Sequence, residues 1–254
     1  MRKKMMAGNW KMHANHLEAI QMVQKLSYRL DLPDYERVEV VVCPPFTALR
    51  SCQTVIETDH LAIRLGAQNC DWHDEGPFTG EIAPPMLSKL SVKYVIVGHS
   101  ERRQLFGETD EVVNQKAKAV LANGMTPIIC VGETEAERDA GEAEARVAVQ
   151  VQAAIAGLDA EVVASVVVAY EPIWAIGTGR TASADDAGAM CTFVRERIRE
   201  AAYSAADSTR ILYGGSVNPG NVAGLMAKKD IDGGLVGGAS LDPDTFASVI
   251  RYWV

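Results

Sequence analysis

Residues 166–171 read VVVAYE, a short and largely apolar run that ends in a glutamate. Such a run lacks the polar alternation of a half-exposed strand, and it indicates a β-strand that is buried on both faces. Strands of this kind are typical of parallel sheets that helices cover on both sides. A carboxylate directly after such a strand, here Glu171, is costly to bury unless it has a function. The stretch therefore predicts a parallel α/β fold and marks Glu171 as a candidate general base.

Similar apolar runs recur along the whole chain. They lie at 5–8, 38–43, 63–67, 94–97, 128–131, 166–170, 211–213 and 234–236. Helical periodicity fills two of the intervening stretches, one behind Thr109 and one behind Ser183. Eight strands in 254 residues give about 32 residues per strand–helix unit, which suits right-handed crossovers. No Gly-x-Gly-x-x-Gly follows the first run, which disfavours an open dinucleotide-binding sheet. We therefore predict a single (β/α)8 barrel that forms one catalytic domain over residues 1–254.

Composition excludes several classes of function. The chain has 25 basic and 33 acidic residues and a net charge of −8, which argues against nucleic-acid and membrane-surface binding. Its five cysteines form no C-x-x-C pair, so we expect reduced thiols and a cytoplasmic protein. The apolar run near the N-terminus is too short for a signal peptide, and no apolar run is long enough to span a membrane. We expect a soluble protein without nucleic-acid or membrane partners.

Polar residues follow several predicted strands, at the end where a barrel carries its active site. Lys11 follows the first strand and can present a cation to a phosphate or a developing oxyanion. His99 follows the fourth strand at an expected helix start, where backbone N–H groups would lower its pKa and keep the ring neutral. Burial would raise the pKa of Glu171 into the range of a general base. The structural alternatives are a surface lysine, a capping histidine and a salt-bridged glutamate.

The last three strand ends predict a lid and a phosphate site. Residues 172–179, PIWAIGTG, form an apolar loop that we interpret as a lid that excludes water. Glycine pairs at 214–215 and 237–238 follow the seventh and eighth strands, and their N–H groups can approach an anion closely. Barrels often bind phosphate with these two loops. Two glycine pairs in successive loops predict a phosphorylated substrate.

Taken in order, these motifs resemble the triosephosphate isomerase family. The matching segments are AGNWKM at 7–12, CPPF at 43–46, GAQN at 66–69, GPFTGEI at 76–82, VGHSERR at 97–103, CVGET at 130–134, AYEPIWAIGTG at 169–179, YGGSV at 213–217 and GLVGGASL at 234–241. The resemblance implies a TIM barrel that interconverts dihydroxyacetone phosphate and D-glyceraldehyde 3-phosphate through an enediolate. This is a reaction of glycolysis and gluconeogenesis, and the resemblance implies no cofactor.

The resemblance also implies a role for each site residue. Glu171 would move the proton between adjacent carbons, while neutral His99 would polarise the carbonyl and shuttle protons between the two oxygens. Lys11, with Asn9 nearby, would offset the charge of the phosphate and the enediolate, and Glu101 would position Lys11. The phosphate would be held by backbone N–H groups of Gly177, Ser216, Gly237 and Gly238.

The segment from Gln68 to Glu81 resembles the family's interdigitating loop, in which Thr79 reaches into a second copy of the chain. The resemblance therefore implies a homodimer. The sequence departs from the family at two positions. Arg180 follows the lid where lysine is commoner, which keeps the charge, and His13 stands where asparagine is frequent, outside the matched catalytic positions.

Other functions remain open on the residues alone. A Schiff-base aldolase on the same barrel needs a lysine at a buried strand end, where this chain has Glu171. A metal-dependent sugar-phosphate epimerase needs converging ligands, and the remaining histidines (His13, His16, His60 and His73) lack ligand spacing, so we expect no metal site. A non-catalytic phosphate-binding barrel would not need Lys11, His99 and Glu171 together.

Overall fold

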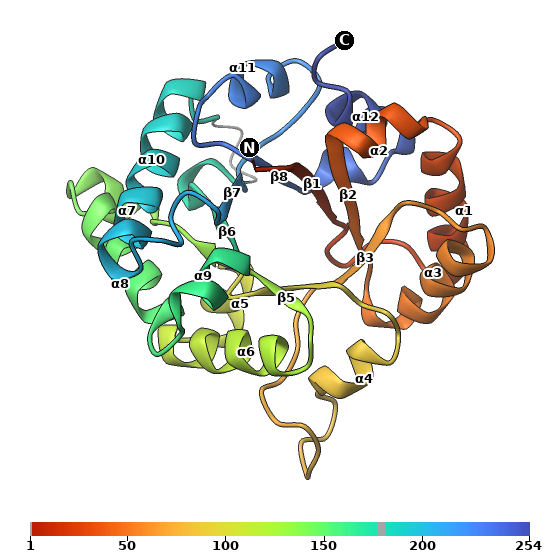
Figure 1. The fold of residues 1–254 in the computed structure, drawn as a ribbon, viewed down its shortest axis with the longest axis horizontal. Coiled ribbons are helices and arrows are strands. Elements are labelled where there is room, and N and C mark those ends of the chain that lie inside the picture. Colours follow the sequence, from red (N-terminus) through yellow and green to blue (C-terminus); the bar gives the residue numbers. More distant parts are fainter. Residues whose placement is uncertain (1, 177–180) are drawn as a thin grey trace.

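The strands form a closed parallel barrel in a computed structural model that describes residues 2–176 and 181–254. Each strand is hydrogen-bonded to the next one along the chain, and β8 pairs with β1 to close the ring (Figure 1). The strands are β1 Lys4–Asn9, β2 Val38–Cys43, β3 Arg64–Ala67, β4 Tyr94–Val97, β5 Thr126–Val131, β6 Val167–Tyr170, β7 Arg210–Tyr213 and β8 Gly233–Val236. The predicted (β/α)8 barrel is confirmed.

Helices connect the strands and surround the barrel on the outside (Figure 1). The α-helices are α1 His16–Ser27, α2 Leu32–Arg37, α3 Phe46–Thr58, α4 Pro84–Ser88, α5 Ser100–Phe106, α6 Asp110–Ala122, α7 Glu135–Asp139, α8 Ala143–Ile155, α9 Ala160–Ser165, α10 Ala184–Ala201, α11 Val222–Met226 and α12 Pro243–Ile250. Two 3-10 helices lie in loops, η1 Ile173–Ala175 and η2 Gly238–Ser240. Among the described residues, none of the helices combines the length and the apolar character needed to cross a membrane.

The predicted strands are all present, and their ends differ from prediction by at most two residues. The largest difference is at β5, which begins at Thr126 and includes Pro127. Pro127 lies near the start of the strand and is paired with Val95, so its missing N–H costs little there. The two helix starts are confirmed as well, because the side chains of Thr109 and Ser183 cap α6 and α10.

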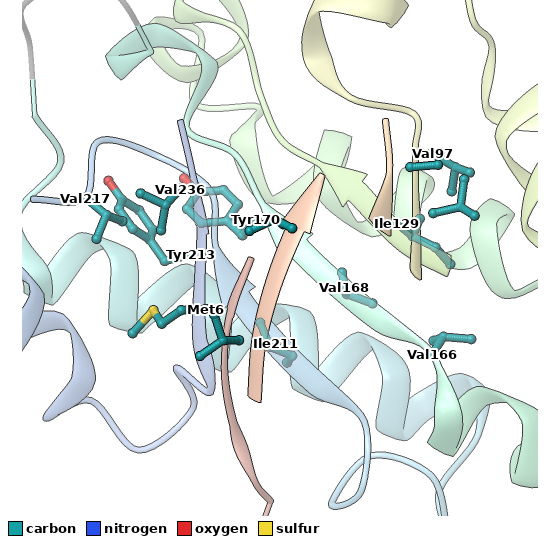
Figure 2. Packing of buried hydrophobic residues seen from close by; sticks show 14 of the residues in the cluster. Met6, Val97, Ile129, Val166, Val168, Tyr170, Ile211, Tyr213, Val217 and Val236 are labelled. Atoms are coloured by element: carbon teal, nitrogen blue, oxygen red, sulfur yellow. The ribbon is translucent and has the colours of Figure 1, made fainter. Parts of the chain in front are cut away.

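The β6 run illustrates why continuous apolar runs predicted the strands. Val168 and Tyr170 belong to the larger buried cluster, between the strands and the helices (Figure 2). Val167 and Ala169 belong to a second buried cluster, inside the barrel. Alternate residues thus face two different apolar layers, and neither face reaches water. Each fully buried valine side chain contributes roughly 1.5–3 kcal/mol, so the continuous apolar run is favoured over an alternating one.

Candidate active site

A cavity of about 440 Å³ lies among the loops that follow the carboxyl ends of β1, β4, β6, β7 and β8. Most of the predicted site residues line it, namely Asn9, Lys11, His99, Glu101, Ser216, Gly237 and Gly238. Glu171 does not line this cavity, because its side chain is only 2% exposed and is held by neighbouring groups. Gly177 lies outside the described residues. The barrel therefore brings the predicted residues from five different strands to one place.

Lys11 crosses one wall of the cavity. Its Nζ lies 2.5 Å from Oε1 of Glu101, and its Cε lies close to Gly237, where an added Cβ would be 3.8 Å away. The backbone N–H of Lys11 donates to Oδ1 of Asn9 at 3.1 Å. This arrangement places the cation between the β4 loop and the β8 loop, and it supports a positioning role for Glu101.

His99 forms the start of α5 and uses both ring nitrogens. Gly98 before it has a φ of +68°, a conformation that favours glycine, and this turn brings the ring to the helix start. Nδ1 accepts the backbone N–H of Glu101 at 3.2 Å, while Nε2 lies 3.0 Å from Oε1 of Glu171. A nitrogen that accepts carries no proton, so in the neutral ring the proton is on Nε2. That nitrogen is aimed at the candidate base.

Glu171 is buried but well supplied with hydrogen-bond donors. Its Oε2 accepts the backbone N–H of Ser100 at 2.9 Å, and the Ser100 hydroxyl donates to Oε1 at 3.3 Å. Because an unpaired buried polar group costs about 1–3 kcal/mol, and a charged one more, these bonds make burial of the carboxylate tolerable. Two glycines leave room for the residue: an added Cβ at Gly132 would lie 1.8 Å from its carbonyl oxygen, and one at Gly214 would lie 2.9 Å from its Cγ.

The ionisation of Glu171 and His99 is set by their mutual contact. Burial raises the pKa of Glu171, but the charge of His99 and the hydrogen bonds from His99 and Ser100 together lower it below its ordinary value. Burial lowers the pKa of His99, but the charge of Glu171 and the hydrogen bond between them raise it above its ordinary value. The two predicted pKa directions are therefore wrong for the free protein. Burial and the helix start act on the two side chains one at a time, and the close contact between His99 and Glu171 outweighs both.

We expect the titration of His99 to depend on Glu171. In the wild-type protein the ring should lose its proton above its ordinary pKa of 6.5. In Glu171→Gln it should do so below that value, because the charge that raises the pKa is gone while burial, which lowers it, remains. An NMR titration of the imidazole signals measures both midpoints, and the signal missing from His99→Gln identifies the residue. Equal midpoints in the two proteins would show that Glu171 does not control the ring.

The glycine pairs line the opposite side of the cavity. Gly214, Gly215 and Ser216 follow β7, and Gly237 and Gly238 follow β8 and lead into η2. A short 3-10 helix, η2, thus follows the eighth strand. Backbone N–H groups at such a turn suit an anion that the net charge of the protein would otherwise repel.

The described part of the predicted lid, residues 172–176, is packed rather than freely exposed. The indole N–H of Trp174 donates to Oε1 of Glu133 at 2.8 Å, and the guanidinium of Arg138 lies 4.5 Å from the centre of the indole ring. Tyr170 also donates to this oxygen of Glu133, at 3.0 Å. Residues 177–180, which include the rest of the lid and Arg180, lie outside the described residues.

Two residues of the site escaped the sequence analysis. Ser100 binds Glu171 through both its N–H and its hydroxyl, and its position at a helix start was a usable signal. Glu133 is a fully buried carboxylate two residues after the end of β5, as Glu171 is one residue after the end of β6, so a similar argument would have marked it. Glu133 accepts a hydrogen bond from Tyr170, which directly precedes Glu171, and another from Trp174, which lies three residues after Glu171.

Comparison with known proteins gives one consistent result. The family model described as triosephosphate isomerase matches residues 4–253. A protein of Streptomyces coelicolor named triosephosphate isomerase is 54% identical over 252 residues, which are 99% of this chain and 98% of that protein. Proteins of the same name from Herpetosiphon aurantiacus and Cutibacterium acnes are 52% and 50% identical, over 99% of this chain and 100% and 98% of their own lengths.

Proposed function

This chain belongs to the triosephosphate isomerase family, and from that premise we propose how its cavity performs the reaction. The enzyme is an isomerase that interconverts dihydroxyacetone phosphate and D-glyceraldehyde 3-phosphate, a step of glycolysis. The observation that carries the assignment of residues is the meeting of Glu171, His99 and Lys11 at one barrel end. A carboxylate base, a ring N–H donor and a cation are the groups that proton transfer next to a carbonyl requires.

We assign the proton transfer to Glu171. Its carboxylate removes a proton from the carbon next to the carbonyl, and the electron pair of that C–H bond moves into the enediolate. The Nε2–H of His99 donates to the substrate oxygen on which negative charge develops. Glu171 then returns the proton to the adjacent carbon, and His99 transfers a proton from the substrate hydroxyl to the former carbonyl oxygen, which completes the isomerisation with no net oxidation or reduction. For this, the carboxylate exchanges its bonds to Ser100 and His99 for a place beside the substrate.

Substrate binding changes which interactions determine the pKa values of Glu171 and His99. In the free protein the contact between His99 and Glu171 lowers the pKa of the carboxylate and raises that of the ring. A substrate that enters between them removes this contact and leaves burial, the largest single influence on each. Burial then favours a neutral imidazole and a more basic carboxylate. The contact thus favours the charged form of each group until the substrate separates the pair, and only then do the two side chains acquire the properties that the chemistry needs.

We assign the binding of the charged substrate to Lys11 and to the loops after β7 and β8. Lys11 lies between Glu101 and Gly237, so its cation can reach a phosphate at the glycine pairs and an oxyanion near His99. Asn9 holds the backbone of Lys11 through its side-chain oxygen, which makes it a positioning residue in this geometry. The backbone N–H groups of Ser216, Gly237 and Gly238 would bind the phosphate, with Gly177 as the fourth predicted group.

The proposed chemistry needs no metal ion, and we expect full isomerase activity in EDTA. The assay couples the formation of dihydroxyacetone phosphate from D-glyceraldehyde 3-phosphate to its reduction, with and without the chelator. Within the described ranges, 2–176 and 181–254, no group of His, Cys, Asp and Glu is arranged to hold a metal ion. Activity that vanishes in EDTA and returns with a divalent ion would contradict a purely side-chain mechanism.

We also propose that the enzyme is a homodimer built around the loop from Gln68 to Glu81. This loop projects from the barrel between β3 and α4 (Figure 1), and the N–H of Asp71 closes its base by donating to the carbonyl of Ile82 at 2.9 Å. Thr79 near its tip is exposed. Large apolar side chains, Met12, Phe46, Phe78 and Met86, are exposed around the ends of β1 to β3, and Met12 is 94% exposed. Exposed apolar groups in one region are typical of an interface.

The dimer can be tested at Thr79. A charge buried without a partner costs about 3–5 kcal/mol, so Thr79→Asp should weaken the dimer by at least about 100-fold. Sedimentation velocity over a range of protein concentrations measures the change. Thr54→Asp is the matched control, since Thr54 is exposed on α3 and should leave the assembly unchanged. A wild-type protein that sediments as a fully active monomer would refute the dimer.

We propose a cytoplasmic location and a single domain over residues 1–254. The five cysteines (Cys43, Cys52, Cys70, Cys130 and Cys191) are all buried and unpaired, which suits a reducing compartment. The closed barrel, from β1 to β8, already uses nearly the whole chain, which supports one catalytic unit.

A further inference from the structure

Lys11 has a backbone conformation that needs support. Its φ is +52°, in the left-handed region that side chains other than glycine rarely adopt. Such a conformation persists only where the surrounding structure imposes it, and it is often found where a side chain must be aimed at a functional site. Here the side chain is the cation of the proposed phosphate and enediolate site. The groups that hold the backbone of Lys11 in this conformation therefore also determine the direction of its side-chain cation.

The two peptide groups of Lys11 are held from opposite sides. Its N–H donates to Oδ1 of Asn9 at 3.1 Å, as described above. Its carbonyl oxygen accepts from the side-chain nitrogen of Gln68 at 2.8 Å. The same nitrogen donates to the carbonyl of Cys43 at 2.9 Å, and that carbonyl also accepts the N–H of Trp10 at 3.2 Å. Gln68 thus links the strained peptide of Lys11 to the end of β2 by two hydrogen bonds, which we call the Gln68 tie.

The Gln68 tie depends on a hydrogen-bond donor. Both groups that face the Gln68 nitrogen are carbonyl oxygens, which only accept, so the tie requires a group that can donate two hydrogen bonds in that position. Gln68 follows β3, Cys43 ends β2 and Lys11 follows β1, so the tie joins three neighbouring strand ends across the barrel rim. The side chain of Glu101 fixes the other end of Lys11, at Nζ.

We propose that Gln68 is a positioning residue for Lys11, which holds its backbone in the left-handed conformation and so aims Nζ at the phosphate and the enediolate. The inference rests on the proposed role of Lys11. It is distinct from a role of Gln68 in the dimer, although Gln68 begins the loop that we assign to the interface. Loss of the tie should release the strained peptide toward an ordinary conformation and move Nζ away from the cavity.

The test compares single and double variants by equilibrium binding and by kinetics. Glycerol 3-phosphate serves as the binding probe, because it carries the phosphate but no carbonyl and cannot react. Gln68→Met keeps the length of the side chain and removes both donors. We expect it to weaken glycerol 3-phosphate binding and to lower kcat/KM about tenfold to a hundredfold, the effect of a misplaced group. Gln53→Met, which also removes a bonded amide but on α3, should change neither value.

The double variant separates positioning from general damage. If Gln68 acts through Lys11, adding Gln68→Met to Lys11→Met should weaken binding no further, within about twofold. An equal loss in both backgrounds would overturn the inference, and so would wild-type binding by Gln68→Met. Wild-type binding by Lys11→Met would instead overturn the proposed role of Lys11 and this inference with it. Sedimentation of each variant shows whether the dimer is intact, so that a loss through dissociation counts against the proposal.

A second substitution gives a pH-dependent readout. Gln68→Glu keeps the shape, and its carboxyl group can donate a hydrogen bond only while it is protonated. Its kcat/KM relative to wild type should therefore fall as the pH rises and the carboxyl group ionises. A ratio that stays constant with pH would contradict the donor role, whether or not Gln68→Met is stable.

Discussion

Glu171→Asp should lower kcat by about 10²–10⁴-fold while changing KM little. The substitution keeps the charge and shortens the side chain by one methylene, which withdraws the carboxylate by about 1.5 Å. A displacement of this size moves the base out of reach of the substrate carbon, and misplacement by 1 Å alone can cost about a hundredfold. Steady-state kinetics in both directions measure the effect. Binding should survive, because Lys11 and the glycine loops that we assign to the phosphate are untouched.

The control for Glu171→Asp is a partly buried carboxylate at the other end of the barrel. Glu39 accepts hydrogen bonds from the hydroxyl of Tyr94 at 2.8 Å and from Arg210 at 2.5 Å. It lies near the start of β2, at the rim of the barrel opposite to the cavity. Glu39→Asp shortens a bonded carboxylate in the same way, so any general loss of stability appears in both variants. Only Glu171→Asp should lose turnover. A turnover like that of wild type in Glu171→Asp would remove Glu171 from the role of base.

The strands and their ends were predictable because both faces of each strand are buried. The runs at 38–43 and 94–97 coincide with β2 and β4, and apart from Glu39 near the start of β2 they are apolar, since a residue that faces either apolar layer is favoured when it is itself apolar. The same physics placed Glu171, because a charged residue that interrupts such a run marks a strand end. Parallel strands then carry their carboxyl ends to one rim, which brings Asn9, His99 and Glu171 together without further information.

The state of the site was not predictable in the same way. Whether the pKa of Glu171 rises or falls depends on a contact of 3.0 Å with His99, and the sequence does not contain that distance. The packing of Trp174 is a similar case. An apolar residue after the base suggested a lid, yet its indole N–H is bonded to Glu133 in the neighbouring loop, a partner that the pairing of β5 with β6 supplies.

Lys11→Met should greatly weaken the capture of phosphorylated substrate. A hydrogen bond to a charged group is worth about 1.5–3 kcal/mol in binding, and a group that stabilises developing charge is worth about 10²–10³-fold in kcat. The two effects multiply, so kcat/KM should fall by at least about 10³-fold. Substitution also leaves the carboxylate of Glu101 without its partner at the cavity wall, where it repels the phosphate. Lys93→Met, at an exposed position before β4, should have no such effect.

The contribution of Glu101 can be separated from that of the lost cation. In the double variant Lys11→Met with Glu101→Gln, the unpaired negative charge is gone, so binding of glycerol 3-phosphate should recover in part while kcat stays low. Recovery of binding without turnover would show that repulsion by Glu101 accounts for part of the binding loss and that the enediolate still lacks its cation. An unchanged KM and kcat in Lys11→Met alone would contradict both roles. A loss confined to kcat would leave the phosphate to the glycine loops and restrict Lys11 to the transition state, because only interactions that strengthen there accelerate the chemical step.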